Sequence, residues 1–168
     1  MNRPHPASLL DALDRVLGAI AAAGLILVLP VSLLLFLQWP LRELVQAYSR
    51  EANDLAQMLF ALYVSIAITY ATRRHAHLAA DAIAHRYSPG VRSVLVRVAA
   101  LLVLVPWSLF ILYAAWPIVL QSVVQLEAFP ETFNPGYFVV KLAVAVLALL
   151  VFLQAVIDVC RGGRLDNP

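Results

Sequence analysis

Three histidines, His75, His77 and His85, lie close together in the sequence and are the side chains best suited to bind a metal ion or a haem. A structural metal site needs about four converging ligands, and Asp81 is the only carboxylate between them. Haem ligation in a membrane anchor would need histidines within facing spans at matched depth. These histidines instead lie in an arginine-rich segment between two apolar stretches. We therefore predict a structural or solvated role, with His77 and Asp81 spaced to pair on one helix face.

Other patterns of catalytic chemistry do not emerge from the sequence. It contains no Ser/His/Asp triad, phosphate-binding loop or pair of buried carboxylates. Cys160 is the only cysteine, which excludes an internal disulfide and a cysteine-ligated iron–sulfur centre. The central turns of the apolar stretches lack Asp, Glu, Arg and His, which an ion or substrate path usually buries. We predict that the chain is not an enzyme, holds no cofactor or metal, and does not itself bind a transported substrate.

The composition identifies the environment that must position these residues. The chain has 168 residues, of which 62% are hydrophobic and 13% are charged, whereas a soluble domain carries about 25% charged residues. A bilayer is therefore the expected solvent. The net charge is only +2, and the basic residues are scattered among apolar segments, so no nucleic-acid partner is expected. The sequence predicts one all-α integral membrane domain over residues 1–168.

Charged residues divide the chain into four apolar segments, each close to the roughly 20 residues that a membrane-spanning helix needs. The first segment is longer than the 7–15 apolar residues of a cleaved signal peptide, so we predict that it stays as a span. Pro30, Pro106 and Pro117 fall inside predicted spans and should kink their helices, because each lacks a backbone N–H. The predicted spans are residues 16–41, 55–72, 98–126 and 137–157.

The distribution of basic residues predicts the orientation of the chain. Of the twelve Lys and Arg residues, nine lie at the termini or between spans two and three. Loops rich in Lys and Arg stay in the cytoplasm, so both termini should be cytoplasmic and residues 42–54 and 127–136 should face outward. Residues 73–97 mix apolar and basic side chains. They form either a short amphipathic helix against the lipid surface or a plain loop that continues into span three.

Small residues in the first span offer a surface on which helices can approach closely. Gly18 and Ala22 form a small-xxx-small pair. The pair is either a contact for a partner helix or ordinary packing within this bundle.

At this point the pattern resembles the small membrane subunit (DctQ-like) of tripartite ATP-independent periplasmic (TRAP) transporters. The second span opens with Asn53 and the sequence DLAQMLFA, and the H-x-x-x-D element follows it. Glu127 lies just beyond span three, before two prolines. The residues that match motifs of the family are Asn53, His77, Asp81, Lys141 and Gln154.

The resemblance implies a non-catalytic scaffold in the bacterial inner membrane that forms a heterodimer with a large permease subunit. The large subunit would hold the sodium and substrate sites and move as an elevator, and a periplasmic binding protein would deliver organic acids or similar solutes. Outward-facing charges are then candidates for docking that soluble protein. These candidates are Arg42, Arg50, Glu51, Glu127 and Glu131.

Two other functions stay open at this level. The chain could anchor a redox enzyme in the membrane and bind haem, although the histidines are poorly placed for it. It could also be a free-standing membrane scaffold.

Overall fold

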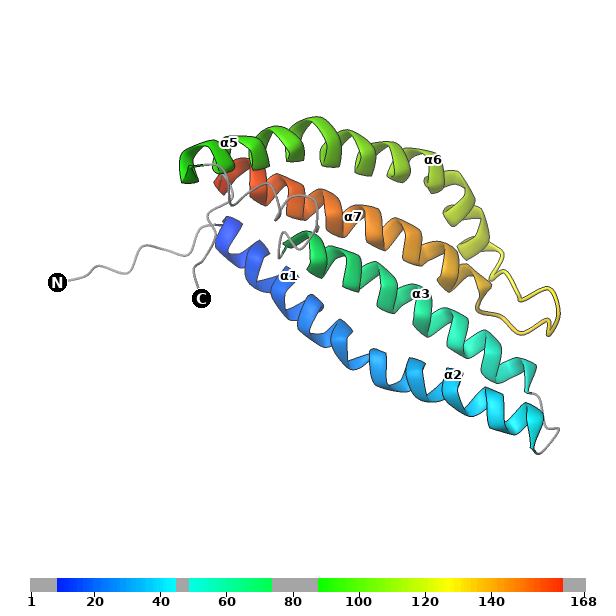
Figure 1. Ribbon diagram of the computed structural model, residues 1–168. Helices are drawn as coiled ribbons and strands as arrows, with labels where there is room; N and C mark the ends of the chain where they lie inside the picture. Colours follow the sequence, from blue (N-terminus) through cyan, green and yellow to red (C-terminus); the bar gives the residue numbers. More distant parts are fainter. Residues whose placement is uncertain (1–8, 45–48, 74–87, 162–168) are drawn as a thin grey trace.

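The computed structural model describes residues 9–44, 49–73 and 88–161 of the chain. Its helices are α1 (Leu9–Ile26), α2 (Val28–Glu43), α3 (Arg50–Arg73), α5 (Pro89–Ala99), the π turn η1 (Ala100–Leu104), α6 (Val105–Val124) and α7 (Tyr137–Arg161) (Figure 1). Four stretches are long and apolar enough to cross a membrane, namely Leu9–Glu43, Arg50–Thr72, Ser93–Val124 and Tyr137–Cys160. The prediction of a helical chain with four candidate membrane spans is confirmed.

The helices extend beyond most of the boundaries predicted from charge. The first three candidate spans begin at Leu9, Arg50 and Ser93, ahead of the predicted residues 16, 55 and 98. A helix is held by backbone hydrogen bonds, which continue through charged side chains that lie beyond the apolar part. Helix α5 continues through η1 into α6, so residues 89–97 extend span three. Residues 74–87 of the predicted amphipathic segment lie outside the described residues.

The first span is interrupted near its middle, three residues ahead of Pro30. Helix α1 ends at Ile26 and α2 begins at Val28, with Leu27 donating its N–H to the Gly24 carbonyl at 3.0 Å. Because Pro30 has no N–H to give to the Ile26 carbonyl, the helical ladder loses a hydrogen bond at this place. The predicted distortion at Pro30 is therefore confirmed, as a short break between two helices.

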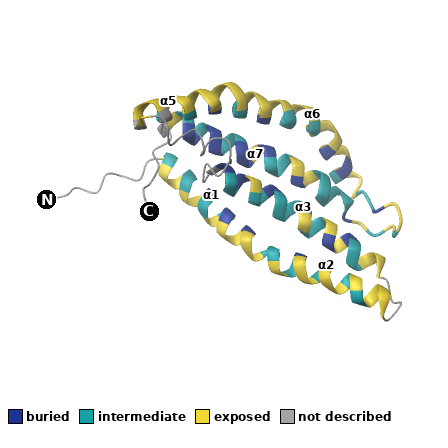
Figure 2. Cartoon of the chain, viewed as in Figure 1, coloured by how far each residue is buried: buried dark blue, intermediate teal, exposed yellow. Residues whose placement is uncertain are grey.

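The four spans lie in a row, in the order α6, α7, α3 and α1–α2 (Figure 1). Helix α7 is the most enclosed, with 44% of its apolar window buried against 11–22% for the other spans, and Figure 2 shows this burial along its length. The described parts of the two predicted outward segments, residues 42–44, 49–54 and 127–136, lie at one end of the helix bundle, while α1 begins and α7 ends at the opposite end (Figure 1). The helices at the two edges of the row, α6 and α1–α2, each have a neighbour on one side only. Their other sides therefore present long apolar surfaces.

Small residues and one interhelical hydrogen bond hold α3 and α7 together in the middle of the row. Ala143, Ala148 and Ala155 of α7 are buried, which lets neighbouring backbones approach closely. The hydroxyl of Ser65 in α3 donates to the Ala143 carbonyl in α7 at 2.8 Å. Leu17 of α1 also reaches α7, where it packs in one cluster with Leu150 and Ile157.

Candidate functional site

The loop between α6 and α7, residues 125–136, folds back on itself through backbone hydrogen bonds. We call it the α6–α7 loop. The N–H of Phe129 donates to the Asn134 carbonyl at 2.9 Å, and the N–H of Tyr137 donates to the Glu127 carbonyl at 3.0 Å. Phe129 is buried and packs edge-on against the Tyr137 ring, with 5.4 Å between ring centroids. The loop is therefore a defined structure with an apolar centre.

Gly136 closes this loop at a place where another residue would not fit. Its φ is +147°, which side chains with a Cβ rarely adopt. A Cβ added there would lie 2.7 Å from the Met58 Sδ of α3. The glycine thus lets the end of the loop rest directly on α3.

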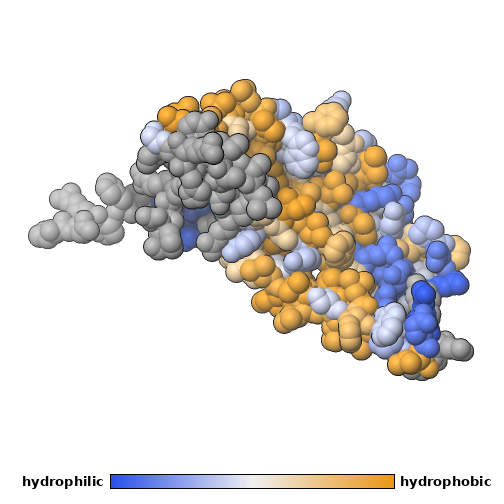
Figure 3. Space-filling model, in the orientation of Figure 1, coloured by the Kyte–Doolittle hydropathy of each residue, from blue (hydrophilic) through white to orange (hydrophobic). Residues whose placement is uncertain are grey.

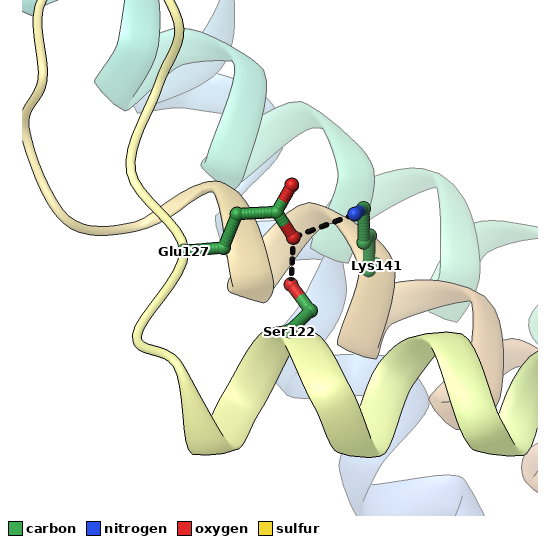
Figure 4. A network of polar contacts seen from close by, with 3 residues as sticks. All are labelled: Ser122, Glu127 and Lys141. Atoms are coloured by element: carbon green, nitrogen blue, oxygen red, sulfur yellow. Dashed lines mark hydrogen bonds and ion pairs between the residues drawn. The ribbon is translucent and has the colours of Figure 1, made fainter.

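Glu127, Lys141 and Ser122 form a polar network at the base of the loop (Figure 4). The Lys141 Nζ donates to the Glu127 Oε2 at 2.5 Å, and the Ser122 hydroxyl donates to the same oxygen. The Lys141 Nζ also lies 5.3 Å from the centre of the Tyr137 ring. The side chains of Lys141 and Glu127 are 29% and 32% exposed. The network joins the last turn of α6, the loop and the first turns of α7.

The network controls the charge of Glu127. The hydrogen bond from Lys141, followed by that from Ser122, lowers the pKa of the Glu127 carboxyl below its ordinary value of 4.5. A lowered carboxyl pKa stabilises the fold above the unfolded-state pKa, and this stabilisation is lost as the pH falls through the folded-state pKa. We expect the loop to loosen only in that acidic range.

This pH dependence can be measured by comparing the wild-type chain with Glu127→Gln. At neutral pH the wild-type chain should have the higher melting temperature, because only the carboxylate pairs with Lys141 as an ion. The difference should shrink as the pH falls below about 4.5, where the wild-type carboxyl becomes protonated. A difference that stays constant over this range would contradict the assignment.

A second anchor joins the loop to α3. The Thr132 hydroxyl donates to the carboxylate of Asp54, which is only 6% exposed, and the backbone N–H of Asn134 donates to Thr132 Oγ1 at 3.4 Å. Asp54 lies near the beginning of α3, where the helix dipole favours a negative charge. No pattern in the sequence indicated this pair, because its members are 78 residues apart. The α6–α7 loop is therefore held by contacts with three helices, α3, α6 and α7.

The predicted docking residues differ in what they contact. Arg50, Glu51 and Glu131 are exposed, and Arg42 is exposed while its Nε lies 3.2 Å from the Glu43 carboxylate. Glu127 is turned toward Lys141. Figure 3 shows hydrophilic surface gathered at this end of the molecule, beside the apolar flanks of the helices. The structure brings the predicted candidates to the same end of the helix bundle. Their docking role stays a prediction.

The predicted family-motif residues are distributed along the chain. The backbone N–H of Asn53 donates to the Ser49 carbonyl at 3.3 Å. Gln154 is buried in α7 and donates its Nε2 to the Asp158 Oδ1 at 3.0 Å. His77 and Asp81 lie outside the described residues. Lys141 and Gln154 therefore lie in different parts of the same helix, α7.

The glycine that packs most closely in the first span is Gly24. A Cβ at Gly24 would lie 2.1 Å from the Ile66 Cγ2 of α3. Gly18 is half-buried and Ala22 is exposed. Their role as a contact for a partner helix stays a prediction.

These features define a helical protein with four candidate membrane spans, and the described residues contain no cluster of metal-ligating side chains. The family model for the DctQ component of tripartite ATP-independent periplasmic transporters matches residues 31–164. The chain therefore belongs to the DctQ family, as the resemblance predicted. Members of this family are components of a transporter. The match therefore does not favour the alternative function of a redox-enzyme anchor. No curated protein and no solved structure matches the chain.

Proposed function

We propose that this chain is the non-catalytic small permease subunit of a TRAP transporter in the bacterial inner membrane. It pairs with a large membrane subunit and widens the static part of the complex. The large subunit imports organic acids or similar solutes with sodium by an elevator movement, and a periplasmic protein delivers the solute. The match of the DctQ family model to residues 31–164 carries this proposal.

Three hydroxyl side chains within the described spans support a scaffolding role. Thr69 donates to the Ser65 carbonyl, Thr72 to the Ile68 carbonyl, and Ser108 to the Leu104 carbonyl, at 3.0, 2.9 and 2.6 Å. Hydroxyls bonded to their own helix in this way remove polar groups from the membrane interior. These hydroxyls serve the helices that carry them, which suits a subunit that leaves the solute to its partner.

Co-purification tests the proposal. The tagged chain should bring the large permease subunit with it from native membranes in mild detergent, at equal stoichiometry. Reconstituted alone into vesicles, the chain should give no solute uptake, and together with the large subunit and the binding protein it should support uptake. Uptake by the chain alone would contradict a scaffolding role. Recovery with a soluble redox enzyme and a haem absorption band would establish the anchor function in its place.

Charge reversal tests the predicted docking surface. Arg50→Glu and Glu131→Lys should each slow uptake a few-fold, because exposed charges at an interface mainly set the rate at which partners associate. The effect should weaken as salt is added. Arg50→Lys and Glu131→Asp keep the charge and are the matched controls. Unchanged uptake in both reversed variants would remove these residues from the docking surface.

A further inference from the structure

Phe133, in the α6–α7 loop, combines an exposed aromatic ring with a strained backbone. Its φ is +56°, in the left-handed region that a bulky side chain rarely adopts. The residue is 82% exposed, so its ring contributes little to the packing of the chain itself. Backbone strain of this kind is concentrated at functional sites, where the surrounding structure imposes it. A role for the ring therefore has to be sought outside the chain's own packing.

The fold requires the left-handed backbone at position 133 but not the phenylalanine. The N–H of Phe133 donates to the Phe129 carbonyl at 2.9 Å, and the N–H of Phe129 donates to the Asn134 carbonyl at 2.9 Å. These two hydrogen bonds close a tight turn over residues 130–133, which we call the loop tip. Gly and Asn adopt the left-handed conformation most readily. Either residue would therefore make the same turn with less strain than Phe133.

Leu126 also has a positive φ, of +47°, but the end of α6 explains it. The N–H of Glu127 donates to the Ser122 carbonyl at 3.0 Å, a hydrogen bond with which many helices end around a left-handed residue. Leu126 lies only two residues beyond Val124, the end of the candidate span, so its apolar side chain is still close to lipid. Neither explanation applies at the loop tip, where Phe133 lies.

The loop tip carries Phe133 outside the lipid. The candidate spans end at Val124 and begin again at Tyr137, so the loop between them belongs to neither. Figure 1 shows this loop projecting beyond the ends of α6 and α7. Glu131, also at the tip, is exposed and charged. Aromatic residues at the membrane boundary are mainly Trp and Tyr, whose polar groups Phe133 lacks. Water is therefore the solvent of the ring until a partner covers it.

The loop tip is held in place by the contacts behind it. The Thr132 hydroxyl donates to the Asp54 carboxylate of α3, and the N–H of Asn134 donates to Thr132 Oγ1 at 3.4 Å. The residues on both sides of Phe133 are thus connected to α3. A side chain on a backbone that is fixed before binding loses less conformational freedom when a partner covers it. Phenylalanine is also enriched in protein interfaces. The loop tip therefore presents a preorganised aromatic contact.

We infer that Phe133 is the main contact on which the periplasmic binding protein docks, and that its ring enters an apolar pocket of that protein. The inference rests on the proposed function and names the residue that contributes most to docking. A soluble protein reaches the end of the molecule that projects from the membrane, whereas a membrane subunit packs beside the spans. The pocket carries a Lys or Arg at its edge, which pairs with the exposed Glu131.

Phe133→Asn separates docking from folding, because it removes the ring and relieves the strain together. In vesicles that contain the complex with the large subunit, the concentration of binding protein giving half-maximal uptake should rise about 30-fold, the effect of losing an aromatic hot spot. The melting temperature of the chain should rise by a few degrees. An unchanged half-maximal concentration would overturn the inference. A lower melting temperature would overturn it too, since the ring would then stabilise the chain itself.

Leu126→Asn is the matched control for this substitution. It introduces the same side chain at the other apolar residue of the loop that has a positive φ. Because Leu126 lies at the end of α6 and not at the loop tip, the half-maximal concentration of binding protein should stay at the wild-type value. A rise as large as that of Phe133→Asn would overturn the assignment of the contact to Phe133.

Photo-crosslinking identifies the partner that covers the ring. Benzoylphenylalanine at position 133 of the complex should crosslink to the binding protein. Crosslinks to the large subunit, to lipid or to a second copy of this chain would overturn the inference. If the unmodified chain neither co-purifies with the large subunit nor supports uptake, the proposed function fails and the inference fails with it. If uptake proceeds and position 133 crosslinks to another partner or to none, only the inference fails.

Discussion

Replacing Gly24 with Ala is expected to destabilise the chain by about 1–3 kcal/mol, the cost of adding a methyl group to a packed core. The added Cβ would lie 2.1 Å from the Ile66 Cγ2 and 2.8 Å from the Ile66 Cβ. Gly24 is buried, so α1 and α3 must separate before the methyl group fits. The free energy of unfolding in detergent, measured with a denaturant, gives the size of the effect.

Two comparisons make this result specific. Gly90 lies in α5 and has no atom within 4 Å of the place that a Cβ would occupy. Gly90→Ala should therefore leave the stability unchanged or raise it slightly, since Ala favours a helix over Gly. Ile66→Ala removes the nearest methyl group, so the double variant should lose less stability than the two single variants added together. Additive losses, or a Gly24→Ala chain as stable as the wild type, would contradict this packing.

The spans could be predicted from the sequence because their apolar length is a local property. Their ends could not, since the helices continue through charged residues such as Asp11 and Arg50. Which glycine of α1 packs against α3 depends on how α1 is rotated about its own axis. For this reason the sequence drew attention to Gly18, whereas Gly24 makes the close contact with Ile66.

The polar network of the α6–α7 loop was only partly predictable. The sequence marked Glu127 as a docking candidate and Lys141 as a family-motif residue, without pairing them. In the structure Lys141 reaches Glu127. Nothing in the sequence connected Asp54 with Thr132, because the contact joins residues that only the row of helices brings together. Contacts between distant segments depend on the register of whole helices, which a single sequence does not state.

Replacing Thr132 with Val is expected to free the α6–α7 loop from α3. The substitution keeps the shape of the side chain and removes the hydroxyl that donates to Asp54. Asp54 is 6% exposed, so its carboxylate would lose a hydrogen bond in a place that water barely reaches. A buried polar group without its partner costs about 1–3 kcal/mol. The melting temperature should fall, and a protease should cut the loop faster.

Thr132→Ser is the matched control, because it keeps the hydroxyl and should leave both measurements close to those of the wild type. If Thr132→Ser and Thr132→Val behave alike, the methyl group rather than the hydrogen bond holds the loop. Uptake assays on the same pair connect the anchor to transport. The exposed Glu131 is adjacent to Thr132, so a loosened loop should also slow delivery of the solute if this surface receives the binding protein. Slower uptake in Thr132→Val alone would therefore show that docking requires the loop to be held in place by α3.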